Sequence, residues 1–215
     1  MRTVRANSRL GHGYFERWRL FAVLTSTLIA LSVWIAAMRG FELDGVRMVI
    51  RFTARTSLLL FSLAFSAAAL ARIWPNAWTR WQARNRRHLG VTFAASHAIH
   101  AIAIACFAAM SPLAFMQATS VASFIFGGIG YAFIMAMTAT SFDRAADMIG
   151  PRAWRMLHLL GGYYLWFQFL VAFGKRIPDM PLYALFLVPL LAVMALRLIA
   201  MAGPRRATAR SLLGH

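Results

Sequence analysis

The sequence predicts an all-α membrane protein with six transmembrane helices. Hydrophobic residues make up 60% of its 215 residues and charged residues only 13%, about half the charged share of ordinary soluble domains. Six apolar runs are each long enough to cross a bilayer, which takes about 20 residues. Most charged residues lie between these runs, and no strand-like alternation persists along the chain. Together these features favour a helical bundle that crosses a bilayer.

The expected helices cover residues 20–38, 54–71, 89–110, 119–140, 154–174 and 181–202. The first run is too long for the apolar core of a cleavable signal peptide, about 7–15 residues, so we expect it to be retained. Pro75 ends the second helix, and Pro151 is suited to the first turn of the fifth. The six helices form one domain, residues 20–202, between basic tails at residues 1–19 and 203–215.

Charge patterning predicts the orientation and excludes nucleic acid as a partner. The net charge is +17, but the basic residues form short clusters between apolar runs and no stripe along one element. Of the Lys and Arg residues, 16 fall on the side of the termini and 6 on the other side. The remaining one, Arg197, can reach the nearby interface. Both termini should therefore be cytoplasmic, in a multi-pass protein of a bacterial inner membrane.

Histidines inside the apolar runs are the candidate functional residues. His97 and His100 lie three apart in the third run, on neighbouring helix faces, and His158 lies in the fifth. Lipid offers an imidazole no hydrogen-bond partner, so such histidines face the bundle interior and mark a proton path, a metal or a cofactor. His88 falls at the interface beside two arginines, where we expect it to be solvated or lipid-facing. His12 and His215, in the polar tails, have no assigned role.

The donor set favours haem over other cofactors. The chain has one cysteine, Cys106, which excludes an internal disulfide and a cysteine-ligated cluster, and no span contains a carboxylate for a proton relay. Imidazoles from two helices suit a bis-histidine haem b. Zinc or copper is less natural, because zinc needs three or four ligands at one level and Arg155 would oppose a dication. The other interpretation is that the histidines only hydrogen-bond neighbouring helices.

Arg55 is the candidate for an anionic group. Arg51 and Arg55 lie four apart and share a helix face at the outer end of the second run. Both can reach the lipid headgroups. Alternatively, Arg55 turns inward and neutralises an anion such as a haem propionate, which the planar guanidinium fork suits.

Several of these segments resemble a known family. The run Arg86-Arg87-His88-Leu89-Gly90, with His100 thirteen residues after Arg87, resembles the third helix of the ferric-reductase-like transmembrane domain. The closest pattern is that of the haem-binding membrane subunit of the bacterial methionine sulfoxide reductase system. The run from Trp154 to His158, with Tyr163, is similar to the family's fifth helix. The resemblance covers about residues 50–175.

This resemblance implies a b-type cytochrome that carries electrons across the inner membrane, the electron-transfer subunit of an oxidoreductase. His158 would be one axial ligand of a single haem, and His100 or His97 the other. The family register favours His100, whereas depth favours His97. Val171 stands where the family often has a second histidine, so a second haem is not expected.

The electron donor in this hypothesis lies outside the chain. Without a flavin or NADPH domain, electrons should come from a quinol or a separate reductase partner, and no motif supports a quinone or flavin site. The alternative function is a haem-free membrane scaffold or assembly subunit that retains the same helical bundle.

Overall fold

The computed structural model describes residues 17–203, so the greater part of both expected tails, with His12 and His215, lies outside the described residues. Every secondary-structure element in this range is a helix. The elements are α1 (Trp18–Ala37), α2 (Leu43–Ile73), α3 (Ala77–Arg84), α4 (Arg86–Met110), α5 (Pro112–Ala118), α6 (Val121–Ala139), α7 (Asp143–Gly174), the 3₁₀ helix η1 (Pro181–Phe186) and α8 (Leu187–Ala202).

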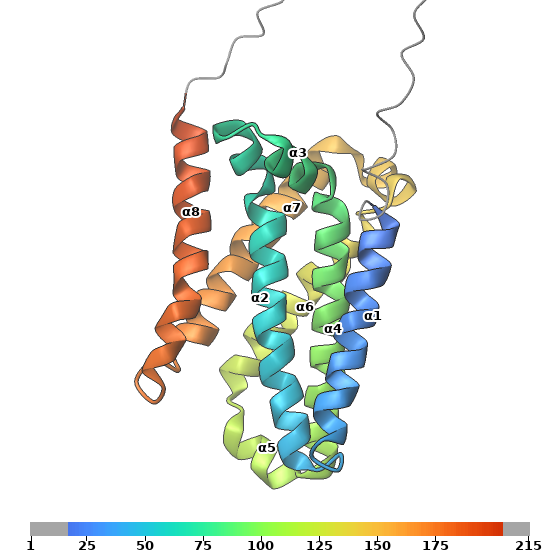
Figure 1. Ribbon diagram of the computed structural model, residues 1–215, viewed down its shortest axis with the longest axis vertical. Helices are drawn as coiled ribbons and strands as arrows, with labels where there is room; N and C mark the ends of the chain where they lie inside the picture. Colours follow the sequence, from blue (N-terminus) through green and yellow to red (C-terminus); the bar gives the residue numbers. More distant parts are fainter. Residues whose placement is uncertain (1–16, 204–215) are drawn as a thin grey trace, which may run out of the picture.

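The six expected spans are confirmed as α1, α2, α4, α6, α7 and η1 with α8, each long and apolar enough to cross a membrane. The chain is therefore a multi-pass membrane protein. Figure 1 shows that α1 begins and α8 ends at the same end of the bundle, where α3 also lies. The short helix α5 lies at the opposite end.

Two helices begin earlier than the sequence predicted. α2 begins at Leu43 rather than at residue 54. The apolar run excludes charged residues, but the helix itself continues through arginines such as Arg47 and Arg51, whose long side chains can reach the membrane interface. α7 begins at Asp143 rather than at residue 154. Its helix is interrupted at Gly150, whose φ of 75° and ψ of 164° favour glycine, and it resumes at Pro151.

Helix α2 is the centre of the packing. Its most extensive contact is with α4, along a seam of small hydroxyl side chains. Ser96 on α4 lies 2.9 Å from the hydroxyl of Ser57 and 3.1 Å from that of Thr56. Small residues let two membrane helices approach closely, and hydroxyl pairs then link them. This seam fixes the depth of α4 relative to α2.

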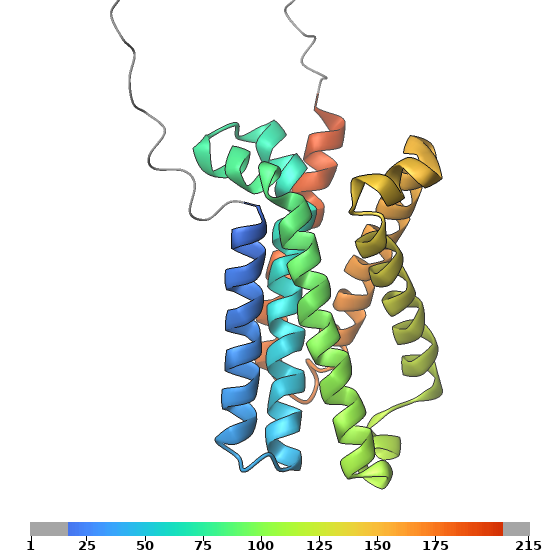
Figure 2. The same ribbon diagram turned by 90° about the vertical axis from the view of Figure 1, so that its right-hand side faces the viewer.

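Helices α6 and α7 form a second pair that contacts the rest of the bundle less extensively (Figure 2). Gly161 and Gly162 are buried where α7 meets its neighbours. A Cβ atom added at Gly162 would lie 2.8 Å from the ring of Phe65 on α2. The glycine pair is therefore explained by close packing.

Arg197 on α8 corrects one expectation. Its guanidinium lies 4.0 Å from the centroid of the Phe65 ring and donates to the Phe65 carbonyl at 3.1 Å. Arg197 therefore packs against α2 instead of extending to the interface. Its positive charge faces an aromatic ring, a favourable arrangement in a dry environment.

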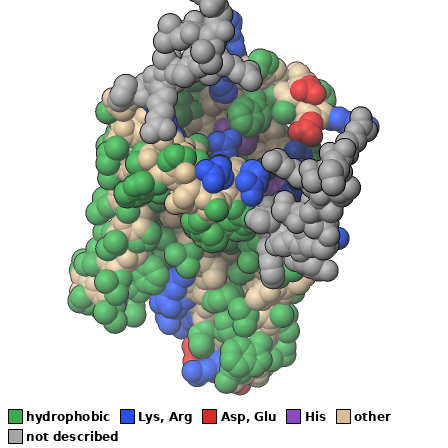
Figure 3. Space-filling model, turned by 45° about the horizontal axis from the view of Figure 1, so that its top comes forward, with side chains coloured by type: hydrophobic (Ala, Val, Ile, Leu, Met, Phe, Trp, Pro, Cys, Tyr) green, Lys and Arg blue, Asp and Glu red, His purple; other side chains and the backbone are tan. Residues whose placement is uncertain are grey.

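Arginines gather at the end of the bundle that carries α3, which comes forward in Figure 3. The exposed ones among the described residues include Arg72, Arg80, Arg84 and Arg86. This end is also where α1 begins and α8 ends, so the basic clusters and both ends of the described chain share one side (Figure 1).

Candidate functional site

His97 and His100 lie together in the middle of α4, as their spacing predicted. Their ring centroids are 5.4 Å apart. The His97 ring faces α6 and α7, with the Tyr131 ring at 5.3 Å and the Phe169 ring at 6.0 Å. Its Nδ1 atom is buried and has no hydrogen-bond partner. His97 therefore occupies an aromatic environment between α4, α6 and α7.

His100 turns toward α2 instead. Its Nδ1 atom lies 3.1 Å from the Ile50 carbonyl oxygen and 2.9 Å from the Thr53 hydroxyl. A carbonyl only accepts, and Thr53 uses its own proton on the Val49 carbonyl at 2.7 Å, so Nδ1 of His100 is the protonated nitrogen. Its Nε2 atom keeps a lone pair and has no hydrogen bond within residues 17–203. Metal-binding histidines are commonly oriented in this way.

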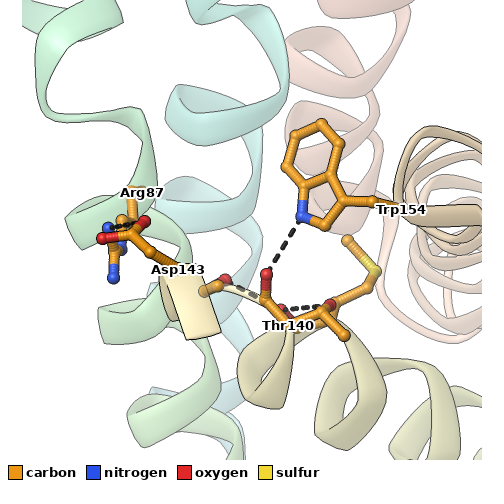
Figure 4. A network of polar contacts seen from close by, with 6 residues as sticks. Arg87, Thr140, Asp143 and Trp154 are labelled. Atoms are coloured by element: carbon orange, nitrogen blue, oxygen red, sulfur yellow. Dashed lines mark hydrogen bonds and ion pairs between the residues drawn. The ribbon is translucent and has the colours of Figure 1, made fainter. Parts of the chain in front are cut away.

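His158 lies on α7, beside Thr140 at the end of α6. Its Nε2 atom is 3.2 Å from the Thr140 hydroxyl, which donates its own proton to the Ala136 carbonyl at 2.8 Å. The His158 imidazole and the Thr140 hydroxyl share one hydrogen bond, whose donor depends on the tautomer of the imidazole. The imidazole also packs on the Trp154 ring, with centroids 4.4 Å apart. Trp154 in turn donates to the Thr140 carbonyl at 3.0 Å (Figure 4).

The structure does not bring His158 beside the histidines of α4. Tyr131 contacts His97 and precedes Thr140 by nine residues on α6, or about 13 Å of helix. Phe169 also contacts His97 and follows His158 by eleven residues on α7, or about 16 Å. The two helices give similar offsets between His158 and His97 along the bundle. His100 lies about 5 Å farther from His158 than His97 does, measured along α4.

A haem shared by α4 and α7 would need His158 and one of the α4 histidines to face each other at one depth. With metal–nitrogen distances of about 2 Å, two axial imidazole nitrogens lie about 4 Å apart. That distance joins ring nitrogens, whereas the offset of about 13–16 Å separates backbone positions along the helices, so the two imidazoles would have to lean toward each other from different depths. Aromatic rings also fill the interior beside His97: Phe61, Phe93 and Phe169 pack with centroids 5.4 to 6.1 Å apart.

The depth of His158 relative to α4 depends on where α7 begins along the bundle, which residue spacing within each helix does not show. In Figure 2 the first turns of α7 lie beyond the start of α4 along the bundle axis. Arg87 reaches Asp143 at the start of α7 through an ion pair of 3.0 Å (Figure 4).

His88 was expected to be solvated or lipid-facing, and this is wrong. It is only 8% exposed and lies edge-on to the Trp18 ring, 5.0 Å between centroids. Trp18 also stacks on Phe142 at 6.0 Å. α1 therefore covers the first turns of α4, and His88 is a buried residue of that contact.

Arg55 is half-buried, and its Nη2 atom lies 3.5 Å from the Tyr183 hydroxyl on η1. Tyr183 was not predicted as a partner of Arg55, and neither Thr53 nor Ile50 was predicted as a partner of His100. A signal for Thr53 was present, because hydroxyl residues recur along the facing segments of α2 and α4. Tyr183 is separated from Arg55 by 128 positions, and no pattern linked them.

Comparisons with protein-family models, with curated proteins and with solved structures found no match to this chain.

Proposed function

We propose that this chain is a haem-free membrane scaffold or assembly subunit, a bundle whose histidines join helices instead of holding a cofactor. The observation that carries this proposal is the offset of about 13–16 Å between His158 and His97, measured along α6 and α7. Histidines that are to share a haem have to face each other at one depth.

The hydrogen bonds of the histidines support the same proposal. His100 joins α4 to α2 through Ile50 and Thr53. His158 joins α7 to α6 through Thr140. Interhelical hydrogen bonds of this kind stabilise membrane bundles by about 0.6 kcal/mol each. These contacts account for His100 and His158 without requiring a metal, whereas the His97 side chain contacts aromatic rings.

The second candidate is a b-type cytochrome that carries electrons across the membrane. The Nε2 lone pair of His100 favours it, because the Nδ1 bond to a carbonyl holds the ring as in a metal ligand. The resemblance to ferric-reductase-like domains favours it as well. In this function the electrons would come from a quinol or a separate reductase, and His158 would have to leave Thr140.

The orientation and the membrane are part of the proposal. We place the basic end of the bundle, with the beginning of α1 and the end of α8, in the cytoplasm of a bacterium, with the bundle in its inner membrane. The excess of Lys and Arg on that side, 16 against 6, supports this orientation.

An absorption spectrum separates the two candidate functions. The full chain is expressed with ample haem, purified in mild detergent and measured oxidised and dithionite-reduced. The scaffold proposal predicts no Soret band and no reducible α band. A stoichiometric low-spin haem that disappears in both His100→Ala and His158→Ala would overturn it and support the cytochrome.

A further inference from the structure

Two arginines from distant parts of the chain converge on one buried tyrosine hydroxyl. Arg55 on α2 approaches the Tyr183 oxygen to 3.5 Å, and Arg176, just after α7, approaches it to 3.2 Å. Both guanidinium carbons lie beside the Tyr183 ring, at 5.7 Å and 5.5 Å from its centroid. The three side chains therefore form one cluster, which we call the outer arginine pair with Tyr183.

The positive charge of this cluster is not balanced by its neighbours. Within residues 17–203 neither Arg55 nor Arg176 forms an ion pair with a carboxylate. Two like charges directed at one atom repel each other unless an anion joins them. Arg55 Nε is also buried without a hydrogen-bond partner, and an unmet buried donor on a charged group is costly. The cluster therefore lacks a negative partner.

The tyrosine adds a donor in the same place. Its oxygen accepts from both guanidinium groups, so its own proton remains available, and no described residue accepts it. Tyr183 is 4% exposed, which holds the hydroxyl in a fixed position. The two guanidinium groups and the tyrosine O–H are thus several hydrogen-bond donors close together. The phenol oxygen is the acceptor that they share.

The position of the cluster allows an anion to reach it. Arg176 is exposed and belongs to the turn between α7 and η1. In both ribbon views this turn ends short of the α1–α2 turn and of α5 at the same end of the bundle (Figures 1 and 2). The exposed Arg176 therefore brings the cluster to the surface at the end of the bundle opposite α3.

We propose that the outer arginine pair with Tyr183 binds a phosphate-class oxyanion, supplied either as the headgroup of an anionic phospholipid or as free phosphate. Arginine binds phosphate oxygens through two parallel N–H bonds, and a phosphate offers enough oxygens for both guanidinium groups and the phenol together. This inference goes beyond the proposed function and does not depend on whether haem is present.

The test measures ligand-dependent stability of the purified full chain, because a ligand that binds only the folded state raises the unfolding temperature. One arm adds sodium phosphate in detergent, with sodium chloride at matched ionic strength as reference. The other arm compares lipid nanodiscs of phosphatidylglycerol with nanodiscs of phosphatidylcholine. Stabilisation by phosphate alone identifies a free anion, and stabilisation by phosphatidylglycerol identifies the headgroup.

The variants show where the anion binds. Arg55→Gln with Arg176→Gln should abolish the stabilisation, and Tyr183→Phe should weaken the apparent affinity about tenfold, the loss expected for one hydrogen bond to a charged group. Arg51→Gln, an exposed arginine one turn from Arg55, is the matched control and should respond like wild type. If the double variant does not fold, Tyr183→Phe decides. No stabilisation of wild type in either arm, or an equal loss in Arg51→Gln, would overturn the proposal.

Discussion

At the scale of single residues, His100 is tied to α2 by two acceptors that use the same proton. The Thr53 hydroxyl, fully buried, is one of them, and the Ile50 carbonyl is the other. Of these two acceptors, only the Thr53 hydroxyl can be removed by a side-chain substitution, because the other is a backbone carbonyl. Thr53→Val keeps the shape of the side chain and deletes the acceptor, so it isolates the interhelical hydrogen bond from packing.

We therefore expect Thr53→Val and His100→Ala to be coupled. In a double-mutant cycle on unfolding in mixed micelles, the coupling energy should be about 0.6 kcal/mol. The control cycle pairs Thr53→Val with His158→Ala, which share no partner in the structure and should be additive. Additivity in the first cycle would mean that the Thr53–His100 contact contributes nothing to stability.

The spacing of residues predicted part of the candidate site. That His97 and His100 occupy neighbouring faces follows from helix geometry, and the structure confirms it. The depth of His158 could not be predicted, because it depends on how far α7 extends beyond α4. The partners of Arg55 could not be predicted either, because Tyr183 reaches α2 only through the tertiary fold.

At the scale of the helices, the Phe65 ring of α2 packs directly against Gly162 on α7. The Phe65 ring that faces this glycine is held on several sides, by Phe61 at 5.0 Å, Tyr163 at 5.5 Å and the Arg197 guanidinium at 4.0 Å. It has little room to move away from an added methyl group. By contrast, an added Cβ at Gly128 on α6 meets no heavy atom within 4 Å.

Gly162→Ala should accordingly lower stability, by about 1–3 kcal/mol for overpacking less the gain of up to about 1 kcal/mol in helix propensity. Gly128→Ala should leave stability unchanged or raise it slightly. Thermal unfolding of both variants in detergent measures the difference. Equal melting temperatures for the two variants would contradict the close contact between α7 and α2.

Hydropathy located all six spans but misplaced two helix starts, for a physical reason. A window of apolar residues reports what lies in the hydrocarbon, whereas α2 continues outward through Arg47 and Arg51. The beginning of α7 lies across an interruption at Gly150 that only a backbone conformation reveals. The short helices α3 and α5 lie outside the spans, where no apolar periodicity marks them.

At the scale of the whole molecule, the basic end of the bundle sets the expected orientation. Fusing a cytoplasm-active reporter to the C-terminus, and separately to the loop after Ile73, should give active reporters in both cases. A fusion after Gly174 should be active only with a reporter that functions outside the cytoplasm. The opposite pattern would reverse the orientation and place the outer arginine pair with Tyr183 on the cytoplasmic side.

The functional proposal depends on the depth of His158 relative to α4, and crosslinking measures that depth directly. In a Cys106→Ser background, cysteine pairs are treated in native membranes with a short, membrane-permeant bifunctional thiol reagent, and crosslinked peptides are quantified by mass spectrometry. The pair at positions 97 and 169, whose rings are 6.0 Å apart, is the reference and should crosslink. The pair at positions 100 and 158 should not. Crosslinking of positions 100 and 158 at the rate of the reference pair would show that the two histidines face each other and can share a haem.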